Sequence, residues 1–239
     1  MKNHIHVAPV LDALREPGLC PFCTMHQKLD ENAAEFIMGP AYMDEDIRSK
    51  TNEAGFCRRH LDKLYAMQNK LGLALMLHTH LKEVRLQSSQ TLNCYSCYLC
   101  DKINETFMRY MDTFFYMWKK ESTPASGILA KKRIMTPFVK SQHEGQHEGN
   151  EMRGLIEALP GFCLPHYHLM IDMSVKLLKK KHLDEFLSVV EPLQQQALQK
   201  LDGDLDWFTK KFDHRYADEP WKDSKDAITR TIAILKGNT

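Results

Sequence analysis

The sequence predicts an all-α protein that carries two copies of one cysteine and histidine pattern. No run of alternating β-branched residues is present, and no Asn-Gly or Asp-Gly turn separates strand-like runs. Apolar residues instead recur mostly at spacings of three or four, as on one face of an amphipathic helix. The order CxxC, then GFCxxH, occurs twice, and such an ordered repetition indicates a duplicated helical unit with pseudo-twofold symmetry.

The two motifs mark where most of the expected helices begin. CPFC and CYLC open the first and third, and GFCRRH and GFCLPH open the second and fifth. The second is supported by the apolar spacing of Leu61, Leu64 and Leu71, and the fifth by that of Leu169, Met173 and Leu177. The remaining stretches lack strand signals and are assigned to helix by the same reasoning. We expect helices at 24–38, 58–90, 101–120, 151–159, 164–181, 183–211 and 223–236.

The repeats suggest how the chain is organised. We expect a first repeat over 1–93, a second over 94–182, and C-terminal helices over 183–239 that pack on both repeats as one compact unit. The second repeat has a longer spacer, and the excess falls at about 121–150, a polar and Gly-rich insertion. Its His143 and His147 are interpreted as solvated loop residues.

The repeated cysteines and histidines have the spacing of metal ligands. Two thiolates of a CxxC can grip one ion from a tight turn, and a cysteine at a helix start shares a face with a histidine one turn later. Together they supply three sulfurs and one nitrogen, a closed tetrahedral set suited to Zn²⁺. We expect site one to be Cys20, Cys23, Cys57 and His60. We expect site two to be Cys97, Cys100, Cys163 and His166.

The seventh cysteine leaves two redox alternatives open. Cys94 extends the second motif to C-x-x-C-x-x-C, a ferredoxin-type spacing that Cys163 would complete as an iron–sulfur site. The first repeat has no third closely spaced cysteine, so the repeat favours zinc at both sites, with Cys94 as a spare or substitute ligand. CPFC also resembles a thiol-oxidoreductase motif, but that chemistry uses a helix start after a strand, and no such strand is expected.

A second candidate site lies near the C-terminus. The segment WFTKKFDHRYADEPW is dense in aromatic and charged residues. Its polar residues could form the active site of a hydrolase or lyase. The simpler interpretation is a helix end that packs on the core, with charge pairs at its exposed edge. These residues are Asp213, His214, Arg215, Asp218 and Glu219. No nucleotide loop, nucleophile elbow or HExxH motif accompanies them.

Composition limits the functional classes. The 239 residues are 43% hydrophobic and 26% charged, which is enough to bury a core. The net charge of +1 argues against a broad nucleic-acid-binding surface, and no apolar stretch is long enough to span a membrane. The chain starts without the apolar segment of a signal peptide, so we expect a cytoplasmic protein. We expect a non-catalytic, zinc-stabilised interaction or regulatory module with a protein partner.

Several longer segments resemble an uncharacterised bacterial family found largely in anaerobic Gram-positive organisms. They are CPFC, YMDEDIRSKTNEAGFCRRH, LGLALMLHTHL, GFCLPHY and FTKKFDHRYADEPW, and the resemblance covers about Cys20 to Leu235. The family is a domain of unknown function, so the resemblance implies that these motifs belong to one unit and implies no catalytic residues. Such organisms would tolerate an oxygen-sensitive cluster, which keeps the iron–sulfur alternative open.

Overall fold

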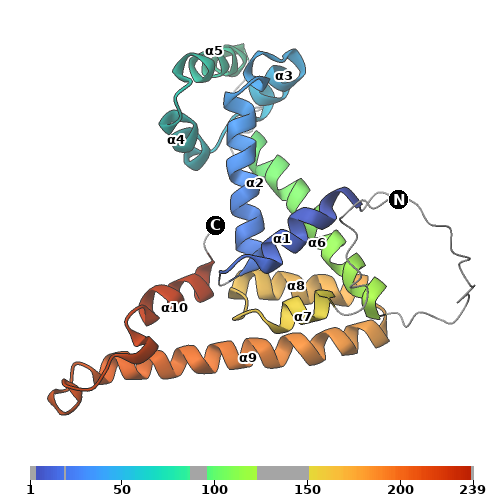
Figure 1. Cartoon of the computed structure of the whole chain (residues 1–239). Helices are drawn as coiled ribbons and strands as arrows, with labels where there is room; N and C mark the ends of the chain where they lie inside the picture. Colours follow the sequence, from blue (N-terminus) through green and yellow to red (C-terminus); the bar gives the residue numbers. More distant parts are fainter. Residues whose placement is uncertain (1–3, 19, 87–95, 123–150, 238–239) are drawn as a thin grey trace, which may run out of the picture. The chain divides into compact units, whose positions relative to one another are not determined.

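The computed structural model describes residues 4–18, 20–86, 96–122 and 151–237, and every regular element within them is helical (Figure 1). This confirms the predicted all-α fold. No helix in these ranges combines the length and apolar character that a membrane span requires. The α-helices are α1 (Val7–Arg15), α2 (Pro21–Met38), α3 (Glu45–Ala54), α4 (Arg58–Ala66), α5 (Lys70–Leu86), α6 (Tyr98–Ser122), α7 (Glu151–Glu157), α8 (Leu164–Leu177), α9 (Lys180–Lys210) and α10 (Ala227–Lys236).

The helix expected over 58–90 is in fact two helices, α4 and α5. Asn69 separates them, because its side-chain oxygen accepts a hydrogen bond from the Gly72 amide at 2.8 Å and so caps the start of α5. The Asn69 amide nitrogen also donates to the carbonyl oxygen of Met38 at 2.8 Å, which ties this break to the end of α2. Apolar spacing continues across the break, so periodicity alone does not reveal it.

Two helices, α1 and α3, were not predicted. α3 begins at a standard N-cap, where the Asp44 carboxylate accepts from the Ile47 amide at 3.0 Å. Its exposed face is strongly polar, so its apolar pattern is weak. Cys94 and most of the predicted insertion, with His143 and His147, lie outside the described residues.

The chain divides into two compact units. Unit 1 comprises Met1–Cys23 and Met111–Asn238, and unit 2 is the intervening Thr24–Tyr110. The boundaries fall inside α2 and α6, so the units do not coincide with the repeats expected over 1–93 and 94–182. Unit 2 is therefore an insertion in the sequence of unit 1.

The core of unit 1 is aromatic. α9 packs against α7, α8 and α10, and α1 packs against α7 (Figure 1). Phe186 of α9 lies edge-on against three rings of α6, with centroids between 5.2 and 6.2 Å apart. Those rings belong to Phe114, Phe115 and Trp118. Pro192 lies inside α9 without ending that helix.

Unit 2 has an aliphatic core. α3 packs on α5, and α4 also contacts α5 (Figure 1). Fully buried side chains from α2, α4, α5 and α6 meet at its centre. They include Ile37, Leu64, Met76 and Leu99. Each unit thus has a core of its own, and each contains one of the cysteine and histidine groups described next.

Candidate metal centres

The two GFCxxH motifs form the same local structure. Cys57 is the N-cap of α4 and Cys163 is the N-cap of α8. A histidine follows one turn later in each helix, and its Nδ1 lies 3.2 Å from the Cys57 sulfur in α4 and 3.1 Å from the Cys163 sulfur in α8. The predicted local pairing of cysteine and histidine is therefore present in both motifs.

The glycine of each motif has a conformational reason. Gly55 and Gly161 both have positive φ, at 64° and 129°, a region that residues with a Cβ seldom adopt. A Cβ on Gly55 would lie 2.9 Å from the His80 ring, and one on Gly161 would lie 2.7 Å from the Cβ of Ala197. The backbone must turn sharply and pass close to a neighbouring helix before the cysteine.

Cluster A comprises Cys20, Cys23, Cys163 and His166, and it lies within unit 1. The Cys23 sulfur is 3.5 Å from that of Cys163 and 3.4 Å from His166 Nδ1. The Cys20 sulfur is 3.7 Å from the same nitrogen. All four residues are buried, and their ligand atoms lie within 4.8 Å of one another.

Cluster B comprises Cys57, His60, Cys97 and Cys100, and it lies within unit 2. His60 Nδ1 is 3.2 Å from the sulfurs of Cys57 and Cys97 and 3.4 Å from that of Cys100. The sulfurs of Cys57 and Cys100 are 3.8 Å apart. All these cysteines are free thiols, since sulfurs in a disulfide would be ~2.05 Å apart.

The predicted grouping of these residues is wrong. Sequence reasoning joined each CxxC to the GFCxxH that follows it, whereas the structure joins the first CxxC to the second GFCxxH and the second CxxC to the first. Spacing determines only the local half of each group, because a CxxC and a GFCxxH meet through the packing of distant helices. The eight residues are those that the repeat pattern singled out, and only their division differs.

The family model of DUF6062 matches residues 1–95, 85–141 and 132–239, segments that together span the chain. The chain belongs to this family of unknown function. No curated protein and no solved structure matches it. Membership confirms the resemblance to a family of unknown function and assigns no activity to this DUF6062 member.

Without a metal ion, hydrogen bonds among the groups of cluster B shift their pKa values. The hydrogen bond to the Cys97 sulfur, with one to Asp30, outweighs burial and raises the pKa of His60 to about 9. Burial disfavours the Cys97 thiolate, but hydrogen bonds to that sulfur outweigh burial and lower its pKa to about 6. Burial and the neighbouring thiolate raise the pKa of Cys100 to about 12. A metal ion would displace the remaining protons when it binds.

Cluster A is similar. Burial disfavours a charged His166, but hydrogen bonds to Cys163 and Cys23 outweigh burial and raise its pKa to about 9. Hydrogen bonds with the neighbouring thiols and burial strongly raise the pKa of Cys20. Both clusters therefore hold an imidazole ring whose Nδ1 faces sulfur.

The two clusters differ in what surrounds them. In cluster B, His60 Nε2 donates to the Asp30 carboxylate at 2.7 Å, and since a carboxylate can only accept, the proton must be on Nε2. Lys63 donates to the other oxygen of Asp30, and the Arg59 guanidinium lies 3.8 Å from Asp30 Oδ1. Asp30 was not predicted, because nothing in the sequence links a helical aspartate to a histidine thirty residues later.

Aromatic rings and one buried amide surround cluster A. The Phe22 ring stacks on Phe162 at 5.7 Å and lies 6.0 Å from the His166 ring. The side chain of Gln194 accepts from the Phe162 amide and donates to its carbonyl oxygen, both at 3.0 Å. This double hydrogen bond fixes the backbone next to Cys163 in an otherwise apolar setting.

The C-terminal polar residues lie mostly at the surface. Asp213 caps a short turn and pairs with Arg215 at 2.6 Å, while His214, Asp218 and Glu219 are exposed. The segment is ordered by Lys211, a buried lysine whose ammonium donates to three backbone carbonyl oxygens in the following loop. The oxygens are those of Tyr216, Ala217 and Glu219. This is the arrangement of a helix end with charge pairs, and the hydrolase or lyase hypothesis loses its basis.

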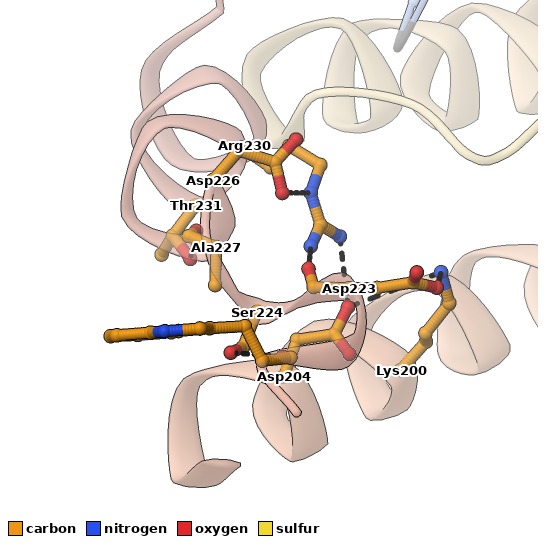
Figure 2. Close-up of polar contacts among 9 residues, drawn as sticks. Lys200, Asp204, Asp223, Ser224, Asp226, Ala227, Arg230 and Thr231 are labelled. Atoms are coloured by element: carbon orange, nitrogen blue, oxygen red, sulfur yellow. Dashed lines mark hydrogen bonds and ion pairs between the residues drawn. The ribbon is translucent and has the colours of Figure 1, made fainter. Parts of the chain in front are cut away.

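A second polar network joins α10 to α9. Figure 2 shows Arg230 donating to the carboxylates of Asp204 and Asp226, both at 2.9 Å, and to the carbonyl oxygen of Asp223. Lys200 donates to the Asp223 carboxylate at 3.1 Å. Each basic side chain of this network is paired with a carboxylate, so its evident role is to hold α10 in place.

Proposed function

We propose that each cluster binds one Zn²⁺ and that the chain is a zinc-stabilised helical protein with a non-catalytic role. The observation that carries this proposal is the pair of Cys₃His groups, whose ligand atoms all lie within 4.8 Å of one another, with close contacts from 3.1 to 3.8 Å. A tetrahedral ion with Zn–S of ~2.3 Å and Zn–N of ~2.0 Å would space two sulfurs ~3.8 Å apart and a sulfur and a nitrogen ~3.5 Å apart. Small adjustments would therefore bring both groups to zinc geometry.

The ligand count supports a structural role. Four protein ligands close a tetrahedral zinc site and leave no position for a catalytic water or a substrate. Each ion would also join segments that are distant in the sequence, so its binding energy would be folding energy. The function then depends on the folded surface, which favours an interaction or regulatory module that binds a protein partner in the cytoplasm.

The iron–sulfur alternative receives less support from the geometry. Cys97 and Cys100 belong to cluster B, whereas Cys163 belongs to cluster A, so the four-cysteine set with Cys94 is divided between two groups. A multi-iron cluster divides its ligands among two or more irons, and ligands of different irons lie farther apart than ligands of one ion. The contacts within each cluster fit a single ion better.

Paired cysteine variants test both the metal and the grouping. The variant Cys23→Ser/Cys163→Ser removes two ligands of cluster A alone, and we expect it to retain one zinc per chain after treatment with a mild chelator. The variant Cys23→Ser/Cys57→Ser removes one ligand from each cluster, and we expect both sites to lose zinc. Metal is counted by mass spectrometry, with a visible spectrum of the parent chain purified without oxygen.

Three outcomes would contradict the proposal. A parent chain without bound metal would refute metal binding altogether. A brown parent with iron and sulfide would establish the iron–sulfur alternative. If Cys23→Ser/Cys57→Ser kept one zinc and Cys23→Ser/Cys163→Ser kept none, the ligands would be grouped within repeats and the grouping proposed here would be wrong.

A further inference from the structure

The geometry points to Cys57 and Cys100 as a modification site for hydroperoxides, at which oxidation to a disulfide releases the metal ion of cluster B. The inference rests on the proposed metal binding and adds a reaction to it. It starts from a difference in burial between the two clusters. All four residues of cluster A are buried, whereas in cluster B only His60 and Cys97 are buried and the other two cysteines are partly exposed.

The two partly exposed cysteines form one edge of cluster B. Their sulfurs are 3.8 Å apart, so they must approach by ~1.8 Å to reach disulfide bond length. Metal ligation would keep both sulfurs as thiolates, the form that reacts with two-electron oxidants, and susceptibility to oxidation also follows exposure. With an ion bound, cluster B would thus present two adjacent thiolates on partly exposed residues.

Cluster A provides an internal comparison. The sulfurs of Cys23 and Cys163 are even closer, at 3.5 Å, but both residues are buried among aromatic rings. If proximity alone decided reactivity, cluster A would be oxidised first. Burial predicts the opposite order.

The reaction balances with hydrogen peroxide as the oxidant. The Cys57 thiolate attacks one peroxide oxygen and the O–O bond breaks. Hydroxide departs, and Cys57 becomes a sulfenic acid. The Cys100 thiolate then attacks that sulfur, the S–O bond breaks, and a second hydroxide leaves as the disulfide forms. The two sulfurs lose two electrons, which reduce the peroxide to two hydroxide ions.

Oxidation would exchange one cross-link for another. The disulfide removes two of four ligands, and His60 and Cys97 alone are too few to complete a tetrahedral site. The new bond joins the start of α4 to α6, which are the same segments that the ion joined. Unit 2 would therefore lose its metal while keeping a connection between these helices, and reduction in the presence of zinc would restore the site.

The test uses the full chain loaded with zinc and carrying Cys94→Ser, which removes the cysteine outside the described residues. Zinc content is measured first, so failure of the proposed metal binding is recognised separately. Hydrogen peroxide is then added with a chromogenic chelator, and disulfides are mapped by peptide mass spectrometry. We expect release of one of the two zinc ions, a Cys57–Cys100 disulfide, retention of helical circular dichroism, and rebinding after treatment with dithiothreitol and zinc.

Three results would overturn this inference and still be compatible with the proposed zinc binding. They are release of both ions at the same rate, release of none, or a first disulfide that involves Cys20, Cys23 or Cys163. A disulfide within Cys97–Cys100 would also overturn it, because exposure of the Cys57 edge would then not direct the reaction.

Discussion

Asp30 offers a sharp test of how cluster B is organised. Its carboxylate accepts the Nε2 proton of His60 at 2.7 Å, which leaves Nδ1, the nitrogen that faces all three sulfurs, as the atom able to bind an ion. A carboxylate in this position fixes the tautomer and the ring orientation of a ligating histidine and makes the nitrogen more basic. We expect substitution of Asp30 to weaken metal binding at cluster B and to spare cluster A.

The magnitude follows from which part of this interaction each variant removes. Loss of such a carboxylate typically costs 10- to 100-fold in metal affinity, or about 1.4 to 2.7 kcal/mol. Asp30→Asn keeps an oxygen that can accept from His60 but loses the charge, so we expect about tenfold. Asp30→Ala removes the acceptor as well, so we expect an effect nearer 100-fold. Lys63 loses its carboxylate partner in both variants.

The assay is competition between the zinc-loaded chain and a chelator of known affinity, read as the concentration that removes each of the two ions. Asp62→Asn is the matched control, because Asp62 is likewise a helical aspartate of unit 2, but it lies in α4 and pairs with the exposed Arg58. A nitrogen-15 NMR measurement of the His60 tautomer provides a readout that a general loss of stability would not change. The reasoning is refuted if Asp30→Asn and Asp62→Asn release zinc alike, or if both clusters weaken equally.

Two further predictions concern residues that hold the backbone in place. Gly161→Ala should destabilise the chain by about 1–3 kcal/mol in a denaturant titration, because φ at Gly161 is positive and the added methyl group would meet Ala197. Gly154→Ala is the control. Its Cβ would meet open space, so in the same titration it should be neutral or stabilise the chain by about 0.4–1 kcal/mol. Equal effects of the two substitutions would refute the close approach. Lys211→Met should lower the free energy of unfolding by about 1–3 kcal/mol without changing the zinc content, because three carbonyl oxygens lose their hydrogen-bond donor. An unchanged unfolding midpoint would show that water replaces the lysine as the donor.

Local sequence features predicted the helices and the half-sites well. The GFCxxH motif places Cys57 at the start of a helix and His60 one turn later, and their closeness follows from helical geometry. The break at Asn69 was missed because apolar spacing continues across it, and α3 was missed because its pattern is mainly polar. These errors arise where a cap, rather than hydrophobic periodicity, determines the boundary.

The contacts of Asp30 and the grouping of the ligands could not be predicted from spacing. Both depend on which helices pack together, and two copies of one motif offer each half-site two chemically identical partners. Repetition made pairing within a repeat the simplest hypothesis, yet nothing in CPFC distinguishes GFCRRH from GFCLPH as a partner. Only the separate cores of the two units decide between them.

The observed grouping is nested, and nesting has consequences for assembly. Cluster B joins segments separated by about 36 residues, whereas cluster A joins segments separated by about 140, with all of unit 2 between them. Closing the shorter loop costs roughly 1 kcal/mol less chain entropy, so cluster B can form first and join α4 to α6 within unit 2. Cluster A would then join segments that folded unit 2 already holds closer than a free chain would. The more exposed cluster would then organise the inserted unit 2 first, and the buried cluster would complete unit 1.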